Sequence, residues 1–466
     1  MTPVRCDALV LFGISGDLAF RKILPAVYSL FARQQLDLPV IGVARGEFDR
    51  PRLIARLRES LQQAHLKVDP AACARLEARL AFVQGDYHDS AAYVRLREAL
   101  AGCQHPLYYL AIPPSLFPVV IGGLDHAGAA RGARVVVEKP FGRDLAGSRA
   151  LNRVLHGVFR ERDVFRIDHY LGKEAVQNLL YFRFANSFLE PVWNRHYIDN
   201  IQVTLAEKSG VGSRGHFYEE AGAIRDVIQN HLLQVLACLT MEAPTGDDIE
   251  AVRDEKAKLL RAVRPLEARN VVCGQYRGYR QEAGVAPESR VETYAAVRLE
   301  IHNWRWAGVP VYLRSGKNLP MSATEVMVEF RRPPQAMFGE HHLGYSNYLR
   351  FRLSPDVAIA MGARVKAPGE GMRGETVELF AMHQHPEEAG PYERLLLDAV
   401  HGDPGLFARE DEVDAAWRIV DPVLAESMPV YDYAAGSWGP EEAGYFVNRP
   451  GGWHPLRMDS VNRAIF

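Results

Sequence analysis

The sequence has few cysteines, and these show no pairing pattern. Cys6, Cys73, Cys103, Cys238 and Cys273 are odd in number and scattered, and no two of them form a CxxC pair. This spacing argues against a disulfide framework and against a structural zinc site. We therefore expect core or surface thiols, and no metal.

The sequence also lacks an excess of charge and a long apolar run. Lysine and arginine number 55 against 57 aspartate and glutamate, for a net charge of −2. This balance gives no field that would attract nucleic acid or an anionic membrane, so any bound anion has to be held by a local site. No stretch approaches the ~20 apolar residues that span a bilayer, and the N-terminus lacks a basic segment followed by an apolar core. We expect a cytoplasmic protein with no nucleic-acid or membrane partner.

Length and apolar content are sufficient for two domains, since the chain has 466 residues of which 48% are hydrophobic. In the first 175 residues, runs such as Ala8–Phe12 and Val40–Ala44 are typical of strands buried on both faces, and amphipathic helical stretches separate them. Six strands interleaved with helices predict an α/β domain with a doubly wound, Rossmann-type parallel sheet over residues 1–175.

After about residue 175 the pattern changes. Alternating or apolar runs such as Tyr294–Ile301 and Tyr348–Leu353 follow one another without a regular intervening helix. They predict a mainly antiparallel sheet with one face open to a partner. Two long helices, Ile224–Thr240 and Glu410–Leu424, are assigned to this part. We predict an α+β domain over residues 176–466, with its boundary placed by the change of pattern alone.

Two loops at predicted strand ends are candidates for a dinucleotide site. The loop from Gly13 to Leu18 does not fit GxGxxG, but it opens the first helix, where free N–H groups and the helix dipole favour a pyrophosphate. A tight turn without a ligand explains this loop alone equally well. Arg45 follows the second strand and offers a guanidinium to a 2′-phosphate, which favours NADP. Glu47 and Asp49 follow closely, so NAD stays open as a weaker alternative.

A third candidate is the segment Arg166–Glu174. It places four groups that can move protons or hold an anion within six positions. A solvated charged loop is the ordinary explanation of one such run. In the predicted helix from Ile224, His231 lies beside the apolar stripe, where a core histidine is more common than a base. Asp226 lies roughly 140° from His231 on an ideal α-helix, so both reach one site only near the helix start.

Together these motifs resemble the glucose-6-phosphate dehydrogenase family over nearly the whole chain. Several motifs in the same order are more specific than any one of them. The resemblance is carried in order by Gly13–Ala19, Glu138–Gly142, Arg166–Glu174, Arg225–His231, Asn303–Pro310, Leu313–Lys317 and Ala435–Pro440.

The resemblance implies a fold and an activity. It implies a Rossmann-type NADP-binding domain, a C-terminal domain with a large antiparallel sheet, and a homodimer or homotetramer formed through that sheet. It also implies oxidation of the C1 hydroxyl of glucose 6-phosphate to 6-phosphogluconolactone with hydride transfer to NADP⁺, the first step of the oxidative pentose phosphate route.

The family's roles can be carried to matching positions. His231 resembles the general base, and Asp168 resembles the carboxylate that orients it; an imidazole with an ordinary pKa of ~6.5 suits this task near neutral pH. The resemblance implies sugar-phosphate contacts by His169, Tyr170, Lys173, Glu207, Asp226, Lys317, Lys139 and Lys22. It implies dinucleotide contacts by Gly13, Ser15, Gly16, Asp17, Leu18, Arg45, Tyr109 and Lys139.

One position departs from the family pattern. Five residues after Lys317 the family usually has a second cation, and here that residue is Ser322. This difference keeps open a related dehydrogenase that acts on a different hexose, on an amino- or deoxy-sugar phosphate or on a free sugar. The broader sugar oxidoreductases that carry Glu-Lys-Pro do not explain the segments 166–174 and 304–317. A non-catalytic NADP(H)-binding sensor is a third alternative, but it predicts damage to His231 or Asp168, and both are intact.

Overall fold

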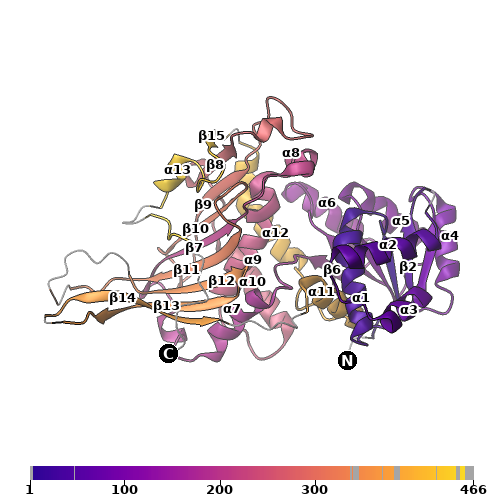
Figure 1. The fold of residues 1–466 in the computed structure, drawn as a ribbon, viewed down its shortest axis with the longest axis horizontal. Coiled ribbons are helices and arrows are strands. Elements are labelled where there is room, and N and C mark those ends of the chain that lie inside the picture. The colour runs from indigo at the N-terminus through magenta and orange to yellow at the C-terminus, as the bar shows by residue number, and fades with distance from the viewer. Residues whose placement is uncertain are drawn as a thin grey trace. The chain divides into compact units, whose positions relative to one another are not determined.

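The computed structural model describes residues 4–46, 48–335, 338, 346–369, 371–382, 389–426, 428–447 and 452–456. The chain forms two compact units, each with its own sheet (Figure 1). Unit 1 contains residues 1–174, 243–257 and 387–417, and unit 2 contains residues 175–242, 258–386 and 418–466. Two later segments of the chain therefore belong to unit 1, whereas the sequence pattern divided the chain into two contiguous ranges.

Unit 1 contains a six-stranded sheet in the order β3-β2-β1-β4-β5-β6, in which every neighbouring pair is parallel. This is the strand order of a Rossmann fold, which confirms the predicted fold class. Five of the six strands are buried at every position, because helices flank them, and this explains their continuous apolar runs. The strands are β1 (Ala8–Phe12), β2 (Val40–Ala44), β3 (Leu80–Gln84), β4 (Pro106–Leu110), β5 (Arg134–Glu138) and β6 (Val164–Ile167).

The helices of unit 1 pack in two groups, as a sheet covered on both faces requires. Helix α1 contacts α2, α3 and α11, whereas α5 contacts α4 and α6. Aspartates at the N-caps of α2, α3, α4 and α6 accept backbone N–H groups and fix where these helices begin. The helices are η1 (Ala19–Ile23), α1 (Leu24–Ala32), α2 (Arg50–Gln63), α3 (Pro70–Arg79), α4 (Ser90–Ala99), η2 (Pro114–Leu116), α5 (Phe117–His126), α6 (Leu145–His156), η3 (Glu161–Asp163) and α11 (Pro391–His401).

Unit 2 contains a nine-stranded sheet in the order β14-β13-β12-β11-β7-β10-β9-β8-β15. The pairs β7–β10 and β8–β15 are parallel and the other neighbours are antiparallel, so the predicted, mainly antiparallel sheet is confirmed. The strands are β7 (Ile198–Ala206), β8 (Val271–Tyr276), β9 (Tyr294–Glu300), β10 (Pro310–Gly316), β11 (Ala323–Phe330), β12 (Tyr348–Ser354), β13 (Ala358–Lys366), β14 (Gly374–Met382) and β15 (Val430–Tyr433).

The predicted helix over residues 224–240 is present, but its first half is a π-helix, η6, which packs on β7, β9 and β10. Helices α3, α6, α7, α8, α10, α11 and α13 were not predicted. The helices that begin after residue 173, apart from α11, are α7 (Glu174–Ala185), η4 (Glu190–Val192), η5 (Gly212–Arg214), α8 (Gly215–Ala223), η6 (Ile224–Leu232), α9 (Leu233–Thr240), α10 (Ile249–Ala262), η7 (Ala268–Asn270), η8 (Tyr279–Gln281), α12 (Glu410–Leu424) and α13 (Glu441–Gly444).

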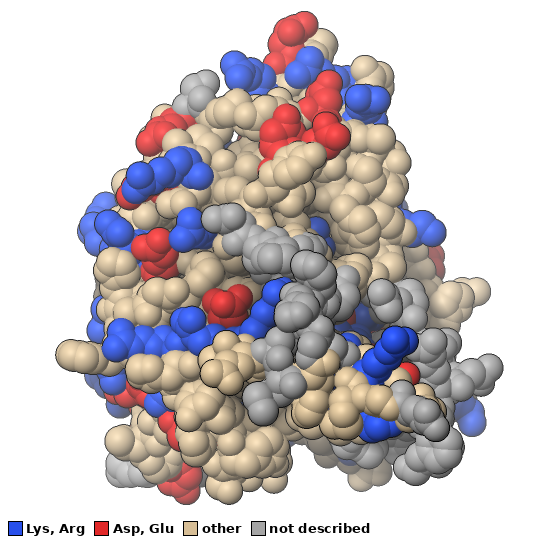
Figure 2. Space-filling model, turned by 90° about the vertical axis from the view of Figure 1, so that its left-hand side faces the viewer, with Lys and Arg blue, Asp and Glu red and all other residues tan. Residues whose placement is uncertain are grey.

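The surface carries charges of both signs. On the face drawn in Figure 2, lysine and arginine lie among acidic residues and large uncharged areas, in keeping with the small net charge. Among the described residues, no helix is both long enough and apolar enough to cross a bilayer.

Candidate functional site

The loop between β1 and η1 has room only for a glycine at its first position. Gly13 has a φ of +78°, and a Cβ atom there would lie 2.2 Å from the carbonyl oxygen of Ala111. The Gly16 N–H donates to the Gly13 carbonyl oxygen at 2.8 Å, which closes the turn. Ser15 and Asp17 are exposed, whereas Gly16 and Leu18 are half-buried. The loop thus brings bare backbone to the carboxyl edge of the sheet, as a pyrophosphate site requires.

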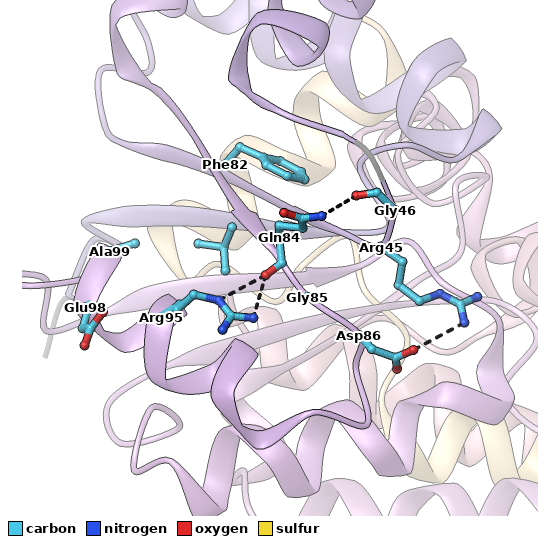
Figure 3. Close-up of a pocket in the computed structure, with 10 residues that line it drawn as sticks. Arg45, Gly46, Phe82, Gln84, Gly85, Asp86, Arg95, Glu98 and Ala99 are labelled. Carbon is cyan, nitrogen blue, oxygen red and sulfur yellow. Dashed lines mark hydrogen bonds and ion pairs between the residues drawn. The ribbon is translucent and has the colours of Figure 1, made fainter.

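Arg45 lies directly after β2, beside a cavity of about 850 Å³ that is open to solvent (Figure 3). Its guanidinium lies 3.8 Å from the Asp86 carboxylate, and both side chains are largely exposed, so this ion pair holds Arg45 weakly. Two acidic residues after Arg45 kept NAD as an alternative cofactor in the sequence analysis. Asp49 caps α2 by accepting the Arg52 N–H at 2.9 Å, and Glu47 lies outside the described residues. The cavity is lined by Arg45, Gly46, Phe82, Val83, Gln84, Gly85, Asp86, Arg95, Glu98 and Ala99.

A buried carboxyl group ends β5 at the same edge. The Tyr109 hydroxyl donates to Glu138 at 2.6 Å, and Tyr392 from α11 is its second tyrosine partner. Burial raises the pKa of Glu138 to about 7, although Tyr109 and Lys139 oppose this rise. Tyr109, predicted to contact the dinucleotide, is itself buried and bonded to Glu138. Tyr392 was not predicted, because nothing in the sequence of residues 387–417 indicates that they return to unit 1.

The segment from Asp168 to Lys173 follows β6 as a tight turn. The Asp168 carboxylate accepts the Tyr170 N–H at 3.0 Å, and its carbonyl oxygen accepts the Leu171 N–H at 2.9 Å. Asp168 is 2% exposed, which is unusual for a carboxylate. Just before the turn, the buried Arg166 binds Glu161 at 2.8 Å, so Arg166 anchors β6.

Three aromatic rings and a cation lie close together at this turn. The His169 ring stacks on the Tyr392 ring with centroids 6.3 Å apart, and it lies 5.3 Å from the Tyr170 ring. Lys173 Nζ lies 3.5 Å from the centroid of the Tyr170 ring. Burial lowers the pKa of Lys173 to about 8, and the charge of Asp168 opposes this fall. The structure therefore brings Asp168, His169, Tyr170 and Lys173 together in unit 1.

The remaining predicted residues of unit 1 differ in their surroundings. Lys139 is half-buried and directly follows β5, whereas Lys22 is exposed on η1. Near α6, side-chain atoms of His156, Glu161 and Glu410 lie within 4.8 Å of one another, a spacing that a metal could bridge. Because Arg166 already neutralises Glu161, we assign no metal to this cluster.

In unit 2, two predicted residues meet because their strands are parallel neighbours. Glu207 follows β7 and Lys317 follows β10, and parallel strands end at the same edge of a sheet. The Lys317 ammonium donates to the Glu207 carboxylate and lies 3.8 Å from the Asp226 carboxylate. Lys317 is 6% exposed. The Tyr433 hydroxyl donates to the backbone carbonyl oxygen of Lys317 at 2.7 Å.

Asp226 and His231 lie on the π-helix η6, and this corrects the helical geometry expected from the sequence. In a π-helix the hydrogen bonds join residues five apart, so residues i and i+5 lie closer together around the axis than in an α-helix. Asp226 is the third residue of η6, and His231, 3% exposed, is the eighth. Asn230 fixes this turn, since its side-chain oxygen accepts the His231 N–H at 2.6 Å.

The helix begins where a glycine permits it. Gly222 has a φ of +64°, and a Cβ there would lie 2.4 Å from the Glu292 carboxylate, which accepts the Ile224 N–H at 3.1 Å.

Ser322, at the position where a cation was expected, is exposed, and its hydroxyl accepts the Lys208 N–H at 2.9 Å. Glu207, Asp226, His231 and Lys317 are thus all in unit 2: Glu207 and Lys317 follow strands, and Asp226 and His231 lie on η6.

Comparison with known proteins covers both halves of the chain. Residues 10–178 match the family model of the glucose-6-phosphate dehydrogenase NAD binding domain, and residues 180–454 match that of the C-terminal domain. A glucose-6-phosphate 1-dehydrogenase 1 of Mycobacterium tuberculosis is 43% identical over 448 residues, which cover 96% of each chain.

Two solved structures are similar in fold and sequence. The glucose-6-phosphate 1-dehydrogenase from Mycobacterium avium has a TM-score of 0.92 and 42% identity, over 98% of this chain and 100% of that one. A glucose-6-phosphate dehydrogenase in complex with its substrate glucose-6-phosphate has a TM-score of 0.89 and 34% identity, with the same coverage.

Proposed function

The chain belongs to the glucose-6-phosphate dehydrogenase family, and we propose that it oxidises the C1 hydroxyl of glucose 6-phosphate to 6-phosphogluconolactone with hydride transfer to NADP⁺. The observation that carries this proposal is the similarity of both halves of the chain to enzymes of this activity, at more than 40% identity over nearly the whole length. The buried polar groups of units 1 and 2 supply the chemistry that such a reaction needs.

We assign binding of the substrate phosphate to Lys173, His169 and Tyr170. A phosphate monoester carries ~ −1.5 to −2 charges near pH 7 and needs several donors. Lys173 suits this task because its ammonium is poorly hydrated, so it gains more from an anion than an exposed lysine would. In unit 2, Lys317 with Glu207 and Asp226 offers both donors and acceptors, which suits the hydroxyls of a sugar.

We assign proton removal to His231 and its orientation to Asp168. A neutral imidazole can accept the C1 hydroxyl proton near neutral pH, and a carboxylate stabilises the imidazolium that forms. The two residues lie in different units, so their pairing rests on the family resemblance. Lys139 and Lys22 are assigned to the region between cofactor and substrate.

The cofactor supplies the hydride acceptor when it is bound, and the groups around the β1 loop fit a dinucleotide. Because Gly13 has no side chain, the backbone of this loop is open to a pyrophosphate at a place that a Cβ atom would fill. Arg45 carries the preference for NADP over NAD, because its guanidinium is weakly held and can pair with the 2′-phosphate. The assigned contacts are Gly13, Ser15, Gly16, Asp17, Leu18, Arg45, Tyr109 and Lys139, with Tyr109 acting through Glu138.

We further propose self-association, as a homodimer or homotetramer, through the nine-stranded sheet. Met361 on β13 pairs with Leu379 on β14, and both are exposed, at 42% and 58%. Val365 lies on the same face and is 40% exposed. An exposed apolar group on the edge strand β14 and its neighbour β13 suits an interface. Light scattering should give the mass of a dimer or tetramer, and Leu379→Glu should shift this mass toward that of the monomer.

We also propose a cytoplasmic location, which agrees with the five free cysteines.

A substrate panel tests the proposed activity. Rates with glucose 6-phosphate, glucose, galactose 6-phosphate and glucosamine 6-phosphate are followed by the absorbance of the reduced nicotinamide, with NADP⁺ and with NAD⁺. We expect the highest kcat/KM for glucose 6-phosphate with NADP⁺. A higher kcat/KM for another sugar would favour the alternative raised by Ser322, and no oxidation of any sugar would favour a non-catalytic NADP(H)-binding sensor.

A further inference from the structure

A second cavity of unit 1 lies at the opposite edge of the parallel sheet from the proposed cofactor loops. It has a volume of about 640 Å³ and is formed by residues that begin β5 or precede β4 and β6. Dinucleotides bind outside the carboxyl ends of parallel strands, so a cavity at the amino ends needs a separate explanation. It is lined by Val4, His105, Ala130, Arg131, Gly132, Ala133, Arg134, Val158, Phe159, Arg160, Arg162, Asp163 and Gly402.

Four of these lining residues are arginines, and one, Asp163, is acidic. Arg134 is 9% exposed and donates only to neutral acceptors: the carbonyl oxygens of Val4 at 2.7 Å and Val400 at 3.1 Å, and Cys6 Sγ at 3.2 Å. Within the described part of the chain, Arg131, Arg160 and Arg162 form no ion pair. The cavity therefore has an excess of three positive charges.

Among the described residues, the nearby carboxylates of Asp7 and Asp403 form no ion pair with these arginines. The carboxylate of Asp7 is already bound by the backbone N–H groups of Gln104 at 2.6 Å and His105 at 2.9 Å. Burial is the main cause that lowers the pKa of His401, which adjoins the cavity through Gly402. The charges of Arg5 and Arg134 add to this fall, and the charge of Asp403 opposes it.

We propose that this cavity binds an organic polyphosphate, at a site separate from the cofactor and the substrate. Guanidinium groups match phosphate oxygens in pairs, and three of them without carboxylate partners call for a ligand with several negative charges. The volume lies within the ~300–1,000 Å³ typical of sites for small organic ligands, and it exceeds what one phosphate fills. This site does not depend on the proposed dehydrogenase activity.

Calorimetric titration of the full chain with sodium tripolyphosphate tests the site. We expect saturable binding that the double variant Arg160→Ala/Arg162→Ala weakens by at least about ten-fold. Arg131→Glu, on a separate segment, should also weaken it. The matched control is Arg269→Ala, which removes an exposed arginine of unit 2 that pairs with Glu267 at 2.8 Å, and it should bind as the unmodified chain does.

Arg45→Ala separates this site from the proposed cofactor site. Tripolyphosphate binding that is lost in Arg45→Ala and retained in the double variant would overturn the proposal, as would equal loss in Arg269→Ala or no saturable binding to the unmodified chain. Arg160 and Arg162 are exposed, so the double variant should keep the thermal midpoint and the kcat/KM of the unmodified chain, which shows that lost binding does not come from lost folding.

Discussion

Replacing Lys173 by methionine should make the protein more stable and a poorer enzyme at the same time. Burial lowers the pKa of Lys173 from 10.5 to about 8, so the folded chain binds this proton less tightly than the unfolded chain does. The ammonium therefore destabilises the fold at every pH below about 8, and this penalty is relieved as the pH rises from about 8 to 10.5. Methionine has a similar shape and no charge to bury.

The magnitude follows from the same pKa values. A fall from 10.5 to about 8 corresponds to about 3 kcal/mol, at about 1.36 kcal/mol for each pH unit. The contact between Lys173 and the Tyr170 ring is lost in the variant and offsets about 1 kcal/mol of this gain. We expect Lys173→Met to raise the free energy of unfolding by about 2 kcal/mol at pH 7, and by much less at pH 10.

Urea unfolding at pH 7 and pH 10 measures the stability, and initial rates give the KM for glucose 6-phosphate. One charged hydrogen bond to phosphate contributes about 1.5–3 kcal/mol, so the KM should rise about ten- to a hundred-fold. Lys173→Arg keeps the charge and should not be stabilised, and Lys208→Met, at an exposed lysine, should change neither quantity. The reasoning is refuted if Lys173→Met is no more stable than the unmodified chain at pH 7, or if its KM for glucose 6-phosphate is unchanged.

Four further predictions concern other residues of the proposed site. His231→Asn should lower kcat by at least ~10²–10⁴ with little change in substrate binding; near-normal turnover would mean that another residue is the base. Arg45→Ala should weaken NADP⁺ binding by about 1.5–3 kcal/mol and leave NAD⁺ binding unchanged, so equal losses would contradict the assignment. Burial raises the pKa of Glu138 to about 7, so this carboxyl group loses its proton as the pH rises through that value. Glu138→Gln should remove the corresponding step from the pH profile of kcat/KM. An unchanged profile would exclude Glu138 from the site. Ser322→Lys should lower the KM for glucose 6-phosphate but not for glucose, and an unchanged ratio of the two would place Ser322 outside the phosphate site.

The sequence predicted β1, β2, β4 and β5 closely, because these strands are buried on both faces and therefore appear as continuous apolar runs. The predicted run Arg134–Glu138 is β5 itself, and Ala8–Phe12 is β1. In unit 2 the strands β8, β13, β14 and β15 were missed. In β13 the first buried positions alternate with less buried ones, but they hold alanine and glycine. Large apolar residues such as Met361 and Leu379 are exposed, so the sequence shows no alternation of apolar and polar residues.

The sequence by itself determined the chemistry of the site: it shows which residues can carry a proton or a positive charge, and where glycines leave the backbone uncovered. Only the tertiary structure decided their environment. The π-helix at residues 224–232 changes the spacing of Asp226 and His231, which an α-helical period cannot indicate. Tyr392 meets Glu138 and His169 because a distant helix returns to unit 1. Burial then shifts the pKa values of Glu138 and Lys173. Desolvation depends on neighbours brought together by folding, and a local motif contains no record of them.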